Sequence, residues 1–419
     1  MAYEATPAVV RAVSAARGST ALRAAWRVFW TTRLAVLLVA VFAALSFGPA
    51  TGGRAAENAA KFDTPHLTQA LADPLLSPLA RWDAVWYLRV AETGYGESEA
   101  RAAFFPLYPL LVRALATPFG ASAAALLAAA YAVALAAFLG ALVLLHRLVT
   151  LELGRPLARP ALLLLGVFPA AFYFGAPYAE SLFLLLSVGA FYAARTERWA
   201  LAGACAAGAA ATRNSGVLLM LPLAIVWWTS RSRRRRDLAW VLLAPLGLAA
   251  YAAFLGVAEG DPLRFLHAHE AWYRELSVPL AGVWEGLDAA GDGFRQLASG
   301  QREVVYFQEA VGDPSRIAAT NLILFGSLVF GLAACAGVFR RLPPAYGSWV
   351  AVSLALPLSE PVKPQPLMSL PRFLAVLFPI FMWLAVWSEE RRATDRVVAV
   401  SAIGLGLLTA QFASWHWIS

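Results

Sequence analysis

The sequence predicts an all-helical protein that crosses a membrane many times. Hydrophobic residues make up 60% of its 419 residues and charged residues only 14%, too few charges to cover a soluble protein of this length. Apolar runs close to the length of a spanning helix recur along the chain, separated by shorter charged segments. Composition therefore places the chain among the polytopic membrane proteins, with about 11 transmembrane helices expected.

The expected spans lie where apolar runs approach the roughly 20 residues that cross a hydrocarbon core. Several are short: Pro169 and Pro177 interrupt one region, and small residues fill 200–212, a pattern that predicts broken or closely packed helices. The expected spans cover residues 31–50, 121–145, 160–177, 179–194, 199–212, 216–229, 238–258, 317–338, 347–358, 373–388 and 397–417.

Charge predicts how these spans are oriented. With this arrangement the N-terminus, 1–30, is cytoplasmic, and most of the 34 Lys and Arg residues fall on the inner side. The block RSRRRRD, 231–237, is typical of a cytoplasmic anchor that contacts anionic membrane lipids, and we expect no nucleic-acid partner. Arginines precede the apolar run 34–48, which has no processing-type end, so we expect a retained first span in the plasma (cytoplasmic) membrane.

Two segments between spans are too long to be turns. Residues 51–115 and 259–316 mix acidic, basic and aromatic residues, and we expect both to be extracytoplasmic loops that bear juxtamembrane helices. Cys205 and Cys335 both fall inside apolar runs, so neither a disulfide framework nor a cysteine-based metal site is expected.

The first of these loops carries the stretch RWDAVWYLRVAETGYG, residues 81–96. Its spacing predicts a short interfacial helix over 82–92 that Gly94 ends. The next apolar piece, 104–111, contains Pro106 and Pro109, which predict a kinked juxtamembrane hairpin. A carboxylate among aromatic residues is unusual in so apolar a chain, and the stretch is therefore the candidate catalytic loop.

Asp83 is the candidate catalytic base. It lies between Trp82 and Trp86, and partial burial beside two indoles would raise the basicity of its carboxylate. The alternative is that Asp83 only caps a helix beginning at residue 84. Further candidates for a binding role are the aromatic residues, whose flat faces suit a sugar ring but which could also form an interfacial belt, together with two polar residues. They are Trp82, Trp86, Tyr87, Tyr108, Trp272, Glu180 and His267.

Arginine suits a phosphate because its planar guanidinium can hold two phosphate oxygens at once. The first candidate is Arg372, followed by Arg213 and then by Lys363 and Arg89, each with the alternative of reaching from the interface toward water. Glu180 and Arg213 both lie at outer span ends, where they either pair with each other or face a wet cavity.

Metal binding by histidine is not expected in the second loop. His267 and His269 are two residues apart, which puts them on different faces of a helix. That segment, 260–276, is expected to begin a helix at Asp261 and Pro262.

Six segments in order resemble those of the PIG-V-type mannosyltransferases, in their bacterial branch, within the GT-C superfamily of glycosyltransferases. They run from about residue 81 to about residue 385, and the first and last are the most specific. They read RWDAVWYLRVAETGYG, FFPLYPLLVR, APYAESLFLLLSVGAFY, RWALAGACAAGAAATRNSGVLLMLP, GDPLRFLHAHEAW and SLPRFLAVLFPIF.

This resemblance implies one GT-C-type membrane domain over 1–419 and an inverting transfer of mannose from a polyprenyl-phosphate donor. It implies Asp83 as the base, a glycolipid or glycan acceptor, and no cofactor, nucleotide sugar or metal. Many GT-C enzymes have a pair of acidic residues in this loop, whereas here Asp83 stands alone until Glu92. Two alternatives remain open: another lipid-linked sugar such as arabinofuranose, or a protein acceptor, on the same scaffold; and a lipid or sugar transporter, for which no inverted repeat is visible.

Overall fold

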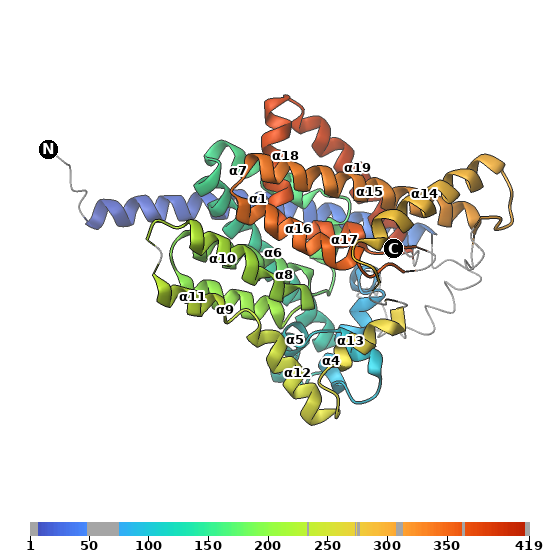
Figure 1. The fold of residues 1–419 in the computed structure, drawn as a ribbon, viewed down its shortest axis with the longest axis horizontal. Coiled ribbons are helices and arrows are strands. Elements are labelled where there is room, and N and C mark those ends of the chain that lie inside the picture. Colours follow the sequence, from blue (N-terminus) through green and yellow to red (C-terminus); the bar gives the residue numbers. More distant parts are fainter. Residues whose placement is uncertain are drawn as a thin grey trace.

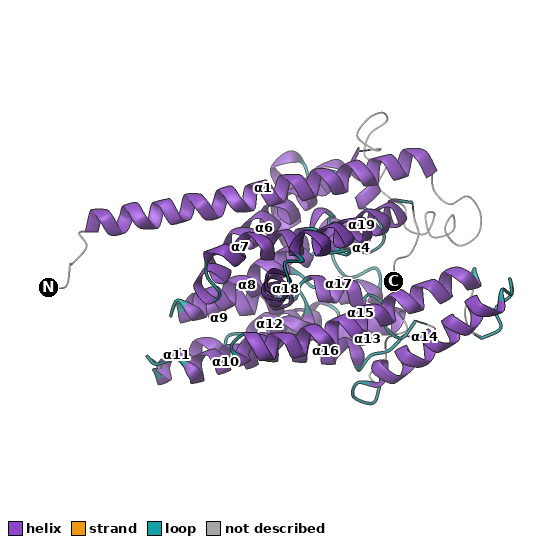
Figure 2. Cartoon of the chain, turned by 90° about the horizontal axis from the view of Figure 1, so that it is seen from above, coloured by secondary structure: helices purple, strands orange, loops and turns teal. Residues whose placement is uncertain are grey.

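The computed structural model describes residues 7–47, 75–232, 234–272, 274, 277–306, 313–362 and 365–414. Every regular element in these ranges is helical, as Figure 2 shows, so the predicted all-helical class is confirmed. The α-helices are α1 (Pro7–Phe47), α4 (Asp83–Thr93), α5 (Leu107–Ala116), α6 (Ala123–Glu152), α7 (Arg155–Gly166), α8 (Glu180–Arg195), α9 (Trp199–Ala210), α10 (Met220–Thr229), α11 (Arg235–Val241), α12 (Leu246–Ala258), α13 (Arg264–His267), α14 (Ala281–Ser299), α15 (Pro314–Arg341), α16 (Pro344–Leu358), α17 (Leu370–Ala375), α18 (Phe378–Glu390) and α19 (Thr394–Ala413). Short 3-10 helices join them: η1 (Ser77–Leu79), η2 (Glu99–Ala103), η3 (Thr117–Phe119), η4 (Ala171–Gly175), η5 (Asn214–Leu219) and η6 (Ala268–Trp272).

Four helices in the described part of the chain are long and apolar enough to cross a membrane. They are Thr20–Phe47 of α1, α6, α15 and α19, and the pair α11 and α12, bent by 42°, would make a fifth. The chain is thus an integral membrane protein by helix length and composition, but the expected count of about 11 spans is not confirmed. Proline accounts for part of the difference: the expected span 373–388 breaks before Pro379 into α17 and α18.

The predicted close packing of the small-residue run is confirmed in α9. A Cβ atom on Gly203 would lie 2.1 Å from the carbonyl oxygen of Trp240 in α11. A Cβ atom on Gly247 in α12 would lie 1.9 Å from the carbonyl oxygen of Ala207. Both distances are far shorter than van der Waals contact, so only glycine lets these backbones touch. These two contacts hold α9 against α11 and α12. Arg213 follows shortly after the end of α9.

The first loop contains the predicted short helix, and its predicted end is confirmed. α4 stops at Gly94, whose φ of 79° is readily adopted only by glycine and whose N–H donates to Val90 O at 3.0 Å. The predicted kinked hairpin at 104–111 is wrong, because α5 is one helix there. Pro106 precedes it and Pro109 falls in its first turn, where backbone N–H groups have no partner within the helix.

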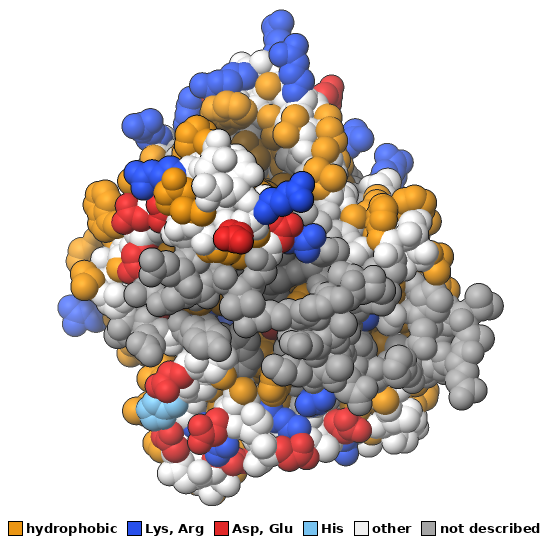
Figure 3. Space-filling view, turned by 90° about the vertical axis from the view of Figure 1, so that its right-hand side faces the viewer, with side chains coloured by type: hydrophobic (Ala, Val, Ile, Leu, Met, Phe, Trp, Pro, Cys, Tyr) orange, Lys and Arg blue, Asp and Glu red, His pale blue; other side chains and the backbone are white. Residues whose placement is uncertain are grey.

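The described parts of the two long loops meet at one end of the molecule, where η2 contacts α13 and η6. In Figure 1, α4 and α13 lie toward the right, as does α14, while the start of α1 and the connection between α10 and α11 lie at the left. That connection contains described residues of the arginine block. Figure 3 looks onto the right-hand end, where acidic side chains appear on the described surface both above and below the region drawn in grey.

Candidate active site

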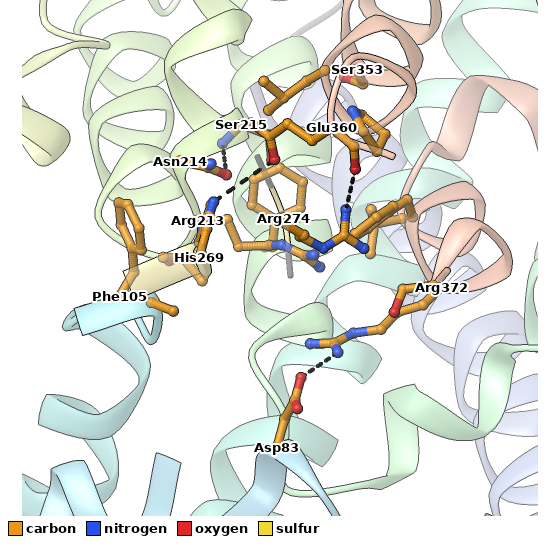
Figure 4. A pocket seen from close by; sticks show the side chains of 18 of the residues that line it. Asp83, Phe105, Arg213, Asn214, Ser215, His269, Arg274, Ser353, Glu360 and Arg372 are labelled. Carbon is orange, nitrogen blue, oxygen red and sulfur yellow. Dashed lines mark hydrogen bonds and ion pairs between the residues drawn. The ribbon is translucent and has the colours of Figure 1, made fainter. Parts of the chain in front are cut away.

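A cavity of about 170 Å³ opens between the two loops. Its walls come from segments far apart in the sequence: α4, the residues before α5, the link from α9 to η5, the region after α13, the end of α16, and α17 (Figure 4). The groups in it that can bear a charge are Asp83, Arg213, His269, Arg274, Glu360 and Arg372.

Asp83 is the first residue of α4 and is 15% exposed at the cavity wall. Its Oδ2 atom accepts a hydrogen bond from Nη1 of Arg372 (Figure 4). The capping alternative is wrong, because the residue that precedes the helix is Trp82 and no side chain caps this end. Trp82 has a φ of 56°, an uncommon value for a residue with a Cβ atom, so the chain turns sharply just before Asp83.

Glu180 is the buried centre of an ionic network. It starts α8, has no exposed surface, and accepts hydrogen bonds from Nη1 of Arg213 at 2.9 Å and from Nε of Arg372. Arg372 therefore bridges Glu180 and Asp83. The two alternatives for Arg213 both hold, since it pairs with Glu180 and also lines the cavity. Two guanidinium groups and two carboxylates leave this network with no net charge.

Arg372 does not reach toward water from an interface. Its side chain is 11% exposed, and its guanidinium carbon lies 5.3 Å from the ring centre of Tyr173 and 5.0 Å from that of Tyr178. Aromatic rings and two carboxylates hold it on the cavity wall.

Arg274 is a third guanidinium in the cavity, which the sequence did not single out. Its Nη2 donates to the carbonyl oxygen of Met368 at 2.8 Å and its Nη1 to that of Glu360 at 3.5 Å. Within the described ranges no carboxylate lies at ion-pair distance from it. Burial lowers the pKa of Arg274 to about 10, so it remains charged at neutral pH. Arg274 is thus a cavity guanidinium outside any ion pair, although the charge of the Glu360 carboxylate acts on it from a longer distance.

His269 lies on the cavity wall, with Nδ1 3.8 Å from Oε2 of Glu360 (Figure 4). Burial, and then the charge of Arg274, lower its pKa to about 4, while burial raises the pKa of Glu360. His269 is consequently neutral at physiological pH. His267 faces away: it is 59% exposed, and its Nδ1 lies 2.9 Å from Oδ2 of Asp261. The two-residue spacing puts these histidines on different sides, as expected.

We expect His269 to make the protein less stable in acid. The unfolded chain gains this proton near pH 6.5 and the folded chain only near pH 4, so stability falls as pH drops through that interval. The loss is on the order of 3 kcal/mol. Thermal unfolding of the wild type and His269→Gln at several pH values isolates this contribution, since Glu360 is present in both. Parallel pH profiles of the two proteins would show that His269 titrates normally.

The predicted aromatic residues divide between the cavity wall and the core. Tyr87 lines the cavity. Trp86 is half-buried and stacks on Phe104, with ring centres 5.8 Å apart. Trp82 is buried, and Tyr108 is fully buried with its hydroxyl donating to the carbonyl oxygen of Ala130 at 2.9 Å.

The remaining predicted residues are not placed in the cavity. Arg89 is half-buried on α4 and is not among the cavity-lining residues. Lys363 and the side chain of Trp272 lie outside the described residues. In the described part of the chain, no three His, Cys, Asp or Glu side chains come together as a metal site would require.

The fold and the cavity define an all-helical membrane protein with a buried ionic site between two loops. The chain belongs to the PIG-V mannosyltransferase family, because the model of that family matches residues 25–243, more than half of the 419 residues. This membership places it among the glycosyltransferases. The matched region includes Asp83, Glu180 and Arg213.

Comparison with solved structures finds the oligosaccharyltransferase of Archaeoglobus fulgidus. The form tethered with an acceptor peptide that contains the NVT sequon is 13% identical, with a TM-score of 0.48 over 92% of this chain and 55% of that one. The form in complex with an inhibitory peptide and a dolichol-phosphate is 14% identical, with a TM-score of 0.46 over 92% of this chain and 56% of that one. The chain thus spans about half the length of these structures. No curated protein sequence matches it.

Proposed function

We propose that this protein transfers mannose, with inversion, from a polyprenyl-phosphate mannose donor to a hydroxyl group of a glycolipid or glycan. The observation that carries the proposal is the cavity itself, which combines the Asp83 carboxylate, held by Arg372, with the guanidinium groups of Arg213, Arg274 and Arg372. Membership of the PIG-V mannosyltransferase family supports mannose as the transferred sugar. The cavity contains a carboxylate and guanidinium groups, which such a transfer requires.

Asp83 is the proposed base. The acceptor hydroxyl gives its proton to the Asp83 carboxylate while its oxygen bonds to the anomeric carbon of the sugar. The bond from that carbon to the phosphate oxygen breaks on the opposite face, which inverts the anomeric configuration. The phosphate leaves as the polyprenyl phosphate. Arg372, fixed by Glu180, keeps the Asp83 carboxylate oriented toward the cavity.

The departing phosphate needs positive charge, and the structure changes which arginine is best placed to supply it. Arg372 and Arg213 are already paired with Glu180 and Asp83, so their charges are compensated. Arg274 is fixed by two backbone carbonyls and, among the described residues, has no carboxylate at ion-pair distance. We therefore place the phosphate at Arg274, with Arg213 and Arg372 as further hydrogen-bond donors.

Replacing Arg274 should impair donor use. Arg274→Gln removes a charge-assisted hydrogen bond to the phosphate, worth roughly 1.5–3 kcal/mol, so kcat/KM for the donor should fall about 10-fold to 100-fold. Steady-state kinetics with polyprenyl-phosphate mannose measure this. Arg89→Gln is the matched control, because Arg89 does not line the cavity. Equal kinetics for the two variants would remove Arg274 from the phosphate site.

We further propose that the cavity faces the extracytoplasmic side of the plasma membrane, in a GT-C-type fold where the shorter helices complete about 11 spans. The arginine-rich connection between α10 and α11 at the opposite end supports this orientation through the positive-inside rule (Figure 1). The donor tail would lie in a groove open to lipid near Arg372.

We also propose that the reaction uses no metal. Arginine side chains would neutralise the phosphate in place of a metal ion. A chelator such as EDTA should therefore leave the transfer rate unchanged. A loss of transfer that added Mg²⁺ or Mn²⁺ restores would contradict this proposal.

The direct test of the proposed function is incubation of the purified protein with polyprenyl-phosphate mannose and a membrane lipid extract. Mass analysis should find one species that gains a hexose. A panel of donors that includes polyprenyl-phosphate arabinofuranose distinguishes the related sugar, and a peptide acceptor distinguishes protein glycosylation. Movement of the donor across vesicle membranes without any product would instead identify a transporter.

A further inference from the structure

A second charged groove lies at the far ends of α15 and α18. α18 begins beside the cavity, since Val376 and Leu377 in front of it line the wall, and it ends at Glu390. The groove has a volume of about 250 Å³ and lies between the last turns of the two helices. It belongs to neither loop and shares no residue with the cavity.

Positive charge dominates this groove. Three arginines line it, Arg340, Arg341 and Arg391, against one carboxylate, Glu390. Arg341 is paired with Glu390 at 2.9 Å. In the part of the chain that the structure describes, neither Arg340 nor Arg391 has a carboxylate at ion-pair distance. Two guanidinium groups are therefore available to an anion from outside.

Two tryptophans form the apolar part of the groove. The guanidinium carbon of Arg391 lies 4.7 Å from the ring centre of Trp387, and its Nη1 donates to the carbonyl oxygen of that residue at 3.4 Å. Trp383 lies against α15 at Gly337, where a Cβ atom would come 2.1 Å from its indole nitrogen. Glycine at 337 thus lets the indole pack directly on the backbone of α15. The groove therefore combines two tryptophan rings with the guanidinium groups of three arginines.

The groove continues onto an exposed apolar surface of α15. α15 is one of the helices long enough to cross a membrane, and on it Val329 and Leu332 are 52% and 46% exposed. These residues precede the groove-lining Ala333 on the same helix. Tryptophan favours the boundary between headgroups and hydrocarbon, where the two indoles would lie. A molecule bound here can place an anionic group on the arginines and a hydrocarbon chain along α15.

We infer that this groove binds an acidic phospholipid of the surrounding membrane. Its phosphate oxygens accept hydrogen bonds from Arg340 and Arg391, since a guanidinium fork matches a phosphate. Its glycerol backbone lies on Trp383 and Trp387, and one acyl chain follows the exposed face of α15. A free phosphate would use the arginines but would gain nothing from the indoles and the apolar helix.

The test is native mass spectrometry of the full chain, delipidated in a neutral detergent and titrated with phosphatidylglycerol, phosphatidylcholine or inorganic phosphate. The wild type should bind one phosphatidylglycerol molecule in preference to phosphatidylcholine. Arg340→Gln and Arg391→Gln should each weaken that binding about fivefold, and the double variant roughly 25-fold. Arg396→Gln, which removes the same charge at the start of α19 outside the groove, should change it less than about twofold.

Three outcomes would overturn the inference. Equal weakening by Arg396→Gln would mean that general surface charge, and no built groove, attracts the lipid. Equal binding of phosphatidylcholine would remove the role of the lipid's net charge. Displacement of phosphatidylglycerol by inorganic phosphate at equal concentration would identify the groove as a site for free phosphate. The three substituted arginines, Arg340, Arg391 and Arg396, are all exposed, so every variant is expected to fold.

Discussion

Asp83→Asn should abolish mannosyl transfer while leaving the fold intact. The amide is nearly the same size as the carboxylate but cannot accept the proton of the acceptor hydroxyl, so kcat should fall about a thousandfold. The amide oxygen can still accept the hydrogen bond from Arg372, which keeps the cavity wall in place. Initial rates of hexose transfer by purified variants, together with their thermal unfolding profiles, measure both effects.

The matched control for this variant is Glu92→Gln. Glu92 is the other acidic residue of α4, and its side chain is exposed. Removing its charge should leave turnover within about twofold of the wild type, because a surface charge far from the reacting atoms contributes little. If Asp83→Asn kept near wild-type turnover, or if both variants lost it equally, Asp83 would not be the base.

Arg372→Gln should destabilise the protein by about 3 kcal/mol, apart from its effect on catalysis. It leaves Glu180, which has no exposed surface, with Arg213 as its remaining cation, and it removes the partner of Asp83. Breaking a buried ion pair by removing one partner costs about 3–5 kcal/mol. Unfolding followed in detergent by intrinsic fluorescence measures the loss.

Two further variants show whether the loss comes from the buried network. Arg295→Gln breaks an exposed pair with Asp292 on α14 and should cost less than about 1 kcal/mol. Adding Glu180→Gln to Arg372→Gln should cost less than the sum of the two single changes, with a coupling of roughly 1–3 kcal/mol. Additive losses, or an Arg372→Gln protein as stable as Arg295→Gln, would show that the bridge contributes no stability.

The sequence predicted those parts of the fold that depend on local signals. Composition was sufficient for the all-helical membrane class, Gly94 for the end of α4, and the small residues of 200–212 for close packing. The number of spans depends instead on where proline stops a helix, which tertiary contacts decide. Pro109 shows why: it would kink the middle of a helix, yet it fits the first turn of α5.

The candidate site was partly predictable for a similar reason. Asp83, Glu180, Arg213 and Arg372 stood out because charges are rare beside apolar runs, although 289 residues separate Asp83 from Arg372. Arg274, His269 and Glu360 lie in polar segments, where a charged residue is common, and only the folded chain brings them to the same cavity.

A structure of Asp83→Asn with bound polyprenyl-phosphate mannose, determined by electron cryomicroscopy, tests the central claim most directly. We expect the phosphate within hydrogen-bonding distance of Arg274, with the anomeric carbon of the mannose facing residue 83. A donor whose phosphate bound away from this cavity, for instance at Arg340 and Arg391, would contradict it.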